Sequence, residues 1–147
     1  MSREKLYLKV VDYTEDPGPR YKRQDKDGTN TSGEMYYITI LNAAFAECYI
    51  EDKELVLILD GVSGYPSSFL DEAIGELIYD FTLDVVMKIL SFETIMFRRR
   101  AQQVIEETYP QWEERRKNKT GVVHSPNIAK TLKKLDDNGT LISYTIE

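Results

Sequence analysis

The chain has 147 residues, of which 41% are hydrophobic and 30% are charged, a composition that fits one globular domain. Its formal net charge of −6 excludes a general nucleic-acid binder, because binding to phosphates requires a basic surface. The single cysteine, Cys48, cannot form an internal disulfide, and with the single histidine, His124, it cannot supply a Cys/His zinc site.

The first residues, MSREKLYLKVVDY, are charged and lack the apolar core of a secretion signal. No stretch approaches the roughly 20 apolar residues of a membrane-spanning helix. We therefore expect a soluble cytoplasmic protein that does not associate with membranes.

The chain begins with a strand and a long loop. Residues 6–13 alternate and are rich in β-forming side chains, which predicts a strand. Residues 14–33 are rich in turn formers, and a loop of about twenty residues is typically functional or mobile. The loop carries a basic cluster that fits either a solvated surface or an anion site: Arg20, Lys22, Arg23 and Lys26.

Residues 32–50 show apolar side chains every three or four positions, which predicts an amphipathic helix. Ser32 is the expected N-cap of this helix. Cys48 falls on the apolar face, so we expect its thiol to pack as a small hydrophobic group.

An unbroken apolar run follows at residues 55–59 and predicts a strand buried on both faces. Residues 60–66 contain two glycines and a proline, which indicates a tight loop. Ser67 and Ser68 open a helical pattern over residues 67–80, and one of the two is expected to cap that helix. A loop in this position of an open α/β sheet lies where ligands and partners bind.

Residues 85–90 form a second apolar run and predict another strand. Ser91 is the expected cap of a helix whose apolar stripe extends to Trp112, and Pro110 is expected to end or kink it. The basic runs at residues 98–100 and 115–119 are interpreted as solvated surface, because neighbouring residues point in different directions around a helix.

The tail, residues 118–147, is expected to be an appendage to a domain that spans residues 1–117. Ser125 and Pro126 are expected to start a short helix that aligns Ile128, Leu132 and Leu135. Residues 136–139 predict a turn and residues 141–146 a strand, which needs a sheet edge in its own chain or in a partner. His124 is expected to be structural or exposed.

The order of elements predicts an α/β layer structure with parallel neighbouring strands. The segment DGVSGYPSSFLDEAIGEL at residues 60–77 resembles the STAS-like domains of unknown function. These are similar to anti-sigma factor antagonists and to the cytoplasmic domains of sulphate transporters. GPRY at residues 18–21 and SGE at residues 32–34 support the resemblance, which covers residues 6–112. It implies a mixed sheet with helices packed mainly on one face.

In anti-sigma factor antagonists, the serine at the start of this helix is phosphorylated by a kinase that is also the anti-sigma factor. The resemblance places Ser67 at that position, followed by Ser68. The chain has Pro66 where the family has an acidic residue, and Phe69 where it has a glycine.

The resemblance implies a non-catalytic regulatory module that docks a signalling protein, such as an ATPase-type kinase. It also implies that phosphorylation of a serine switches this module. No nucleophile elbow or phosphate-cradling motif is present, and we expect neither a cofactor nor a metal ion. The residues expected to contact the partner or a ligand are Asp60, Gly61, Tyr65, Pro66, Ser67, Ser68, Phe69, Asp71, Glu72, Arg20 and Glu34.

Three alternatives remain open from the sequence. The serines can act as helix caps alone, without phosphorylation. The chain can bind a small anion or a nucleotide through the helix N-terminus at Ser67 and the basic loop from Arg20 to Lys26. Finally, the terminal strand can pair between copies of the chain and form a homo-oligomer.

Overall fold

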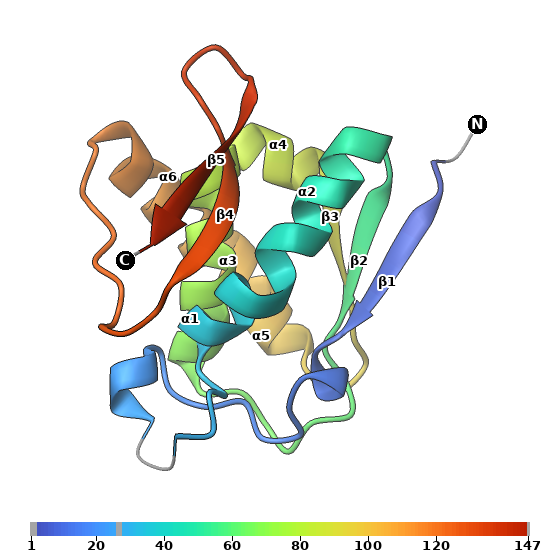
Figure 1. Ribbon diagram of the computed structural model, residues 1–147. Helices are drawn as coiled ribbons and strands as arrows, with labels where there is room; N and C mark the ends of the chain where they lie inside the picture. Colours follow the sequence, from blue (N-terminus) through green and yellow to red (C-terminus); the bar gives the residue numbers. More distant parts are fainter. Residues whose placement is uncertain (1–2, 26–27, 147) are drawn as a thin grey trace.

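The computed structural model describes residues 3–25 and 28–146. It shows a three-stranded parallel sheet with helices packed against it, and a separate two-stranded antiparallel hairpin (Figure 1). The predicted α/β class is confirmed. Among the described residues, no helix combines the length and apolar character needed to cross a lipid bilayer.

The parallel sheet has the order β1-β2-β3, formed by β1 (Lys5–Lys9), β2 (Glu54–Ile58) and β3 (Leu90–Glu93). One face carries Leu55 and Leu57, which are completely buried under the helices. On the other face Tyr7 is 56% exposed, so the helices cover mainly one face, as expected. All pairs within this sheet are parallel, and the antiparallel pair lies in the hairpin.

The first strand is shorter than predicted, because residues 10–13 leave the extended conformation. They form the short 3-10 helix η1 (Val10–Asp12), and the long loop that follows contains a second one, η2 (Lys22–Gln24). Lys26 lies outside the described residues.

The first long helix consists of α1 (Gly33–Tyr36), the π turn η3 (Tyr37–Leu41) and α2 (Asn42–Glu51). The Ser32 hydroxyl accepts a hydrogen bond from the Met35 amide at 3.1 Å, which confirms the predicted N-cap. Cys48 is buried on the core side of this helix, as expected.

Helix α3 (Ser67–Phe81) runs through the middle of the molecule and packs against α1, α6 (Tyr109–Lys117) and the hairpin strand β4 (Lys130–Leu135) (Figure 1). Contact with α6 is closest at Gly75. A Cβ atom added there would lie 2.0 Å from the Trp112 ring, so only a glycine permits this packing.

The strand predicted for residues 85–90 is wrong. Residues 83–89 form helix α4 (Leu83–Ile89), and β3 begins only at Leu90, so Ser91 lies in a strand and is not a cap. Thr82 explains the difference: its φ is +76° where α3 ends, and its hydroxyl accepts a hydrogen bond from the Val85 amide at 3.4 Å. An apolar run this short fits a helix and a strand equally well. The capping residue Thr82 therefore decides in favour of the helix.

The next helix was expected to end or kink at Pro110, and it does not end there. It comprises α5 (Arg98–Gln103), the π turn η4 (Val104–Thr108) and α6. The π turn ends two residues before Pro110, where a regular helix would require the amide that proline lacks.

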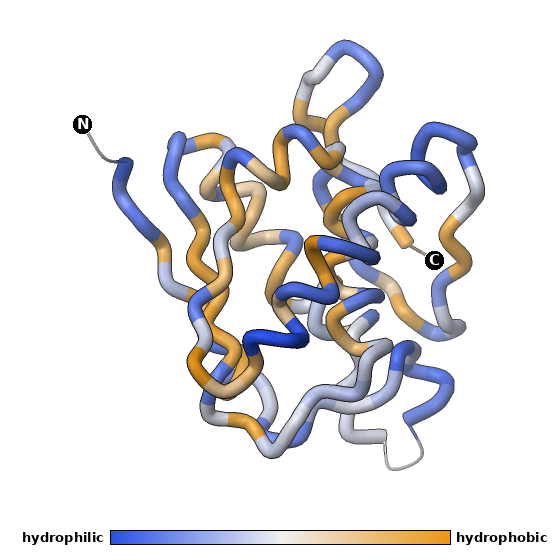
Figure 2. Tube along the Cα trace, turned by 180° about the vertical axis from the view of Figure 1, so that it is seen from behind, coloured by the Kyte–Doolittle hydropathy of each residue, from blue (hydrophilic) through white to orange (hydrophobic). Residues whose placement is uncertain are grey.

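The helix predicted at the start of the tail is also wrong. Residues 130–135 form β4, which pairs with β5 (Leu141–Ile146) across the predicted turn. The alternating exposure of β4 buries Leu132 against the core, together with Ile128 and Ile146. The terminal strand therefore finds its partner in its own chain. Figure 2 shows that the tip of the hairpin is hydrophilic, whereas hydrophobic residues concentrate in the interior.

Asn42, the first residue of α2, joins the hairpin to the rest of the molecule. Its side-chain nitrogen donates to the Lys133 carbonyl at 2.9 Å, and its side-chain oxygen accepts from the Lys133 amide at 2.9 Å. The amide side chain thus binds β4 as a neighbouring strand residue would.

Candidate functional site

Asp60, which follows β2, organises the turn after β3. Its carboxylate accepts hydrogen bonds from the Thr94 hydroxyl and from the backbone amides of Ile95 at 2.8 Å and Met96 at 3.2 Å. The hydrogen bond from Thr94, followed by the one from the Ile95 amide, lowers the pKa of Asp60. The side chains of Ile95 and Met96 are each 75% exposed. Asp60 therefore fixes the turn that carries two solvent-exposed apolar side chains near the carboxyl end of the sheet.

Other residues of the 60–66 loop have structural roles. Gly61 has a φ of +102°, and a Cβ atom there would lie 3.2 Å from the Val11 side chain, so the loop requires glycine. Tyr65 is buried, donates its hydroxyl to the Leu59 carbonyl at 2.6 Å and packs edge-on against the Phe97 ring. Burial raises the pKa of Tyr65.

Helix α3 begins without a side-chain cap. Pro66 is the N-cap residue and no side-chain hydrogen bond caps the helix, so the expectation that Ser67 or Ser68 caps it is wrong. Ser67 is exposed and Ser68 is half-buried. Phe69 is completely buried and packs against the Tyr36 and Tyr65 rings. Ser67 is therefore the accessible hydroxyl of this first turn.

Arg20 links the long loop to the first turns of α3. Its guanidinium donates to Asp71 at 2.7 Å and to Glu72 at 3.1 Å. Asp71 also accepts a hydrogen bond from the Thr108 hydroxyl at 2.8 Å. Glu72 is 1% exposed, and burial raises its pKa although Arg20 opposes that shift. The structure thus brings together three of the residues singled out from the sequence.

Glu34 is completely buried and ties the tail to the long loop. Its carboxylate accepts hydrogen bonds from the Ser125 hydroxyl at 2.6 Å, the Ser125 amide at 2.9 Å and the Lys22 amide at 2.9 Å. It therefore has a structural position away from the surface around Ser67.

The basic cluster of the loop does not converge on Ser67. The Lys22 ammonium donates to the Asn127 carbonyl at 3.4 Å, and the Arg23 guanidinium lies over the Tyr21 ring. Within the described part of the cluster, Arg20 is the member that reaches α3.

A continuous surface surrounds Ser67. Ser67, Arg20, Arg100 and Gln103 line a pocket of about 180 Å³, and a second hollow beside it is lined by residues 95–100 and again by Gln103. Arg100 and Gln103 belong to both hollows, so these are adjacent. We call Ser67, Ile95, Met96, Arg100 and Gln103 together the Ser67 surface.

A second polar region, which the sequence reading missed, lies further along α3. Glu72, Glu76 and Asp80 are 1%, 2% and 8% exposed, and their spacing of four residues places them on one face of the helix. We call these three residues the carboxylate column. An acidic residue at every fourth position of an otherwise apolar helix was the signal available in the sequence.

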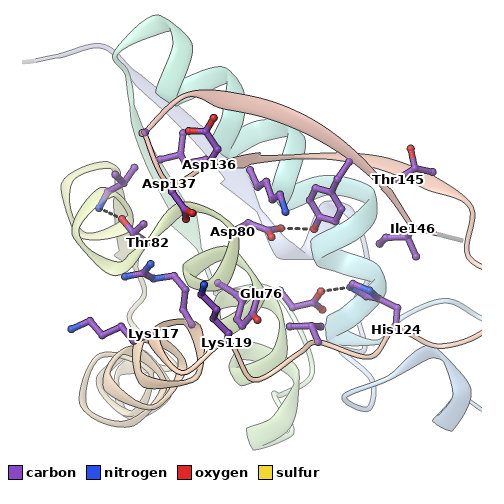
Figure 3. Close-up of a pocket in the computed structure, with 18 of the residues that line it drawn as sticks. Glu76, Asp80, Thr82, Lys117, Lys119, His124, Asp136, Asp137, Thr145 and Ile146 are labelled. Atoms are coloured by element: carbon purple, nitrogen blue, oxygen red, sulfur yellow. Dashed lines mark hydrogen bonds and ion pairs between the residues drawn. The ribbon is translucent and has the colours of Figure 1, made fainter.

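Glu76, in the middle of the column, binds the tail. One of its oxygens lies 2.7 Å from His124 Nε2 (Figure 3). Burial raises the pKa of Glu76 well above its ordinary value, and the neighbouring Glu72 raises it further. Burial also lowers the pKa of His124. Both shifts favour the uncharged forms. The Oε2 atom of Glu76 is buried and has no hydrogen-bond partner among the described residues.

Asp80, at the end of the column, accepts hydrogen bonds from two tyrosines. One is Tyr37 in the π turn η3, and the other is Tyr144 of β5 at 2.7 Å. Burial raises the pKa of Asp80 to about 6, and the two hydroxyls partly oppose this shift. Asp80 therefore connects the first helix, α3 and the hairpin.

Residues 37–95 match the family described as a STAS-like domain of unknown function (DUF4325). Searches of curated proteins and of solved structures gave no match. The matched segment extends from η3 through β3 and includes Asp60, Ser67 and the whole carboxylate column.

Acidic side chains of the matched segment bind other groups of the same chain. Asp60 binds the turn after β3, whereas Asp71 and Glu72 bind Arg20. Among residues 3–25 and 28–146, no group of three histidine, cysteine or acidic side chains is arranged to hold a metal ion.

Proposed function

We propose that this chain is a non-catalytic regulatory module that docks a signalling protein through the Ser67 surface and is switched by phosphorylation of Ser67. One observation carries the proposal: the hollow lined by the exposed Ser67 shares Arg100 and Gln103 with a hollow lined by Ile95 and Met96, which are each 75% exposed. Large apolar side chains exposed side by side are typical of interaction surfaces.

The surroundings of Ser67 favour a phosphate electrostatically. The free amides and the dipole of a 15-residue helix attract negative charge at its N-terminus. Arg100 lines the same pocket as Ser67. Asp71 and Glu72 would repel a phosphate, but Arg20 binds both carboxylates and reduces their repulsion. Ser68 is half-buried and is the less accessible acceptor.

Contact with the partner is assigned to exposed side chains. Tyr65 and Phe69 are 5% and 0% exposed, so they support the surface from below. Ile95 and Met96 supply the apolar contact, and Asp60 fixes the turn that carries them. The partner suggested by the family resemblance is an ATPase-type kinase.

Phosphorylation is tested with ATP and a candidate kinase encoded beside this chain. We expect labelling of the wild type and of Ser63→Ala, which changes an exposed serine in the preceding loop. Labelling should be lost in Ser67→Ala. Labelling that survives in the double variant Ser67→Ala, Ser68→Ala would rule out the phosphoswitch.

Docking is tested separately by titrating the same kinase with charge-introducing variants. Met96→Glu should weaken binding at least tenfold, because it puts a charge in the apolar contact. Ile105→Glu is the matched control, since Ile105 is 52% exposed and lies outside the Ser67 surface. Equal binding by both variants would place the docking site elsewhere.

A small-anion site is the second candidate, and the pocket shared by Ser67, Arg20 and Arg100 favours it. Its volume of about 180 Å³ suits a phosphate ion better than a nucleotide. Arg20 already binds two carboxylates, so Arg100 is the main available charge. Inorganic phosphate should then raise the melting temperature of the wild type but not that of Arg100→Gln.

A further inference from the structure

A larger pocket lies at the other end of α3, away from the Ser67 surface. It has a volume of about 1030 Å³ and is enclosed by α3, α4, the end of α6 and the tail (Figure 3). This volume falls at the upper end of the range for small-molecule sites. We call it the tail pocket.

Basic and acidic side chains both line the tail pocket. Four basic side chains line it: Arg116, Lys117, Lys119 and Lys134. Two of them already have partners, because Arg116 forms an ion pair with Glu113 at 2.6 Å and Lys134 lies over the Tyr144 ring. Lys117 and Lys119 are exposed and form no ion pair with another residue of the described chain.

The acidic side chains of the pocket are mostly engaged within the protein. Glu76 binds His124, and Asp80 accepts hydrogen bonds from Tyr37 and Tyr144. Asp136 accepts hydrogen bonds from two backbone amides of the hairpin turn, those of Asn138 and Thr140, both at 2.9 Å. Asp137 acts electrostatically on Arg116, which leaves Lys117 and Lys119 as the lining cations that form no ion pair among the described residues.

The walls of the pocket suit an organic body larger than a bare anion. Half-buried apolar side chains line it between the basic side chains and the column: Tyr79, Val85, Val122 and Leu135. Behind them, the buried Oε2 atom of Glu76 has no hydrogen-bond partner among the described residues and can hydrogen-bond a hydroxyl or amino group. A ligand that fits therefore carries a strong anion at one end and hydrogen-bond donors at the other.

We propose that the tail pocket binds a phosphate monoester of a small polyhydroxylated molecule, a sugar phosphate or a nucleoside monophosphate, with Lys117 and Lys119 holding the phosphate. The ammonium groups of both lysines form no ion pair among the described residues, and a phosphate can bind them as point charges. This site is independent of docking or phosphorylation at the Ser67 surface.

Calorimetric titration of the full chain tests this proposal with four probes: ribose 5-phosphate, adenosine 5′-monophosphate, adenosine and inorganic phosphate. At least one of the two monoesters should bind, and the preferred one identifies the body of the ligand. Adenosine and inorganic phosphate should each bind at least tenfold more weakly than that monoester. Absence of binding by both monoesters at millimolar concentration would overturn the proposal. So would inorganic phosphate binding as tightly as they do.

Variants locate the site. The double variant Lys117→Glu, Lys119→Glu should weaken monoester binding at least tenfold while its melting temperature without ligand stays close to that of the wild type. Lys9→Glu makes the same type of change at an exposed position on β1 and should bind as the wild type does. Arg100→Glu should also bind normally. Loss of binding in Arg100→Glu, or wild-type binding in the double variant, would place the monoester outside the tail pocket.

Discussion

The two ends of helix α3 differ in how they use polar side chains. At the N-terminal end, Ser67 is exposed and the carboxylates of the first turns are bound by Arg20. At the C-terminal end, Glu76 and Asp80 are buried and are bound by uncharged groups, His124 and two tyrosines. One end therefore exposes a serine hydroxyl to solvent, whereas the other uses buried polar groups to join the tail to the rest of the molecule.

The largest effect is expected at Gly75, midway between the two ends. Gly75→Ala places a Cβ atom 2.0 Å from Trp112 and should lower the free energy of unfolding by about 3 kcal/mol or more, as measured by urea denaturation. Gly64→Ala is the control, because no atom lies within 4 Å of its added Cβ. Stabilisation of Gly75→Ala, as at an exposed helical glycine, would contradict the close packing of α3 and α6.

Arg20 is the charge that distinguishes the N-terminal end. Arg20→Ala leaves Glu72, which is 1% exposed, without its cationic partner and should cost about 3 kcal/mol of unfolding free energy. Arg99→Ala removes an exposed arginine and should change stability by less than about 0.5 kcal/mol. If the two variants proved equally stable, Glu72 would not depend on Arg20.

Asp80, at the C-terminal end of α3, is expected to make the stability of the protein depend on pH. Its pKa of about 6 in the folded protein lies above the ordinary value of 3.8. The folded state therefore binds more protons than the unfolded state between these values, and stability falls as the pH rises through them. The loss is at most about 3 kcal/mol. Urea denaturation at pH 4 and pH 7 measures it.

Asp80→Asn is the matched variant for this pH dependence, because its amide oxygen can still accept a hydrogen bond from a tyrosine. The decrease in stability from pH 4 to pH 7 should be smaller in the variant than in the wild type. Identical pH profiles would show that Asp80 titrates normally.

The smallest effect is expected at Asp60. Asp60→Ala removes the acceptor of three hydrogen bonds in the turn after β3 and should lower the melting temperature by roughly 3 °C. Asp16→Ala, at an exposed loop position, should leave it unchanged. Kinase binding should weaken in Asp60→Ala alone, because the turn carrying Ile95 and Met96 loses its support.

The N-terminal end of α3 was largely predictable from the sequence, because the residues that indicate its structure are close together in the chain. The apolar run of β2, the glycines after it and the helical pattern from Ser67 all lie within residues 55–80. The capping role of the serines was not predictable in the same way. Pro66 takes the N-cap position, so both serine hydroxyls lie beyond the position from which a side chain caps the helix.

The C-terminal end depends on contacts distant in sequence. Asp80 meets Tyr37 and Tyr144, which are separated from it by 43 and 64 positions. No pattern among neighbouring residues of the sequence predicts such pairings. The tail was misread for a related reason, since Leu132 and Leu135 fit a helix in isolation, and only pairing with β5 selects the strand.

The two hydrogen bonds between Asn42 and the backbone of Lys133 bear on how the protein avoids aggregation. An exposed strand edge is a template on which another chain can add a strand. The Asn42 amide occupies the donor and the acceptor that β4 would offer at this position. A second copy can therefore extend the hairpin here only by displacing Asn42, and β5 remains the more accessible edge for any association between chains.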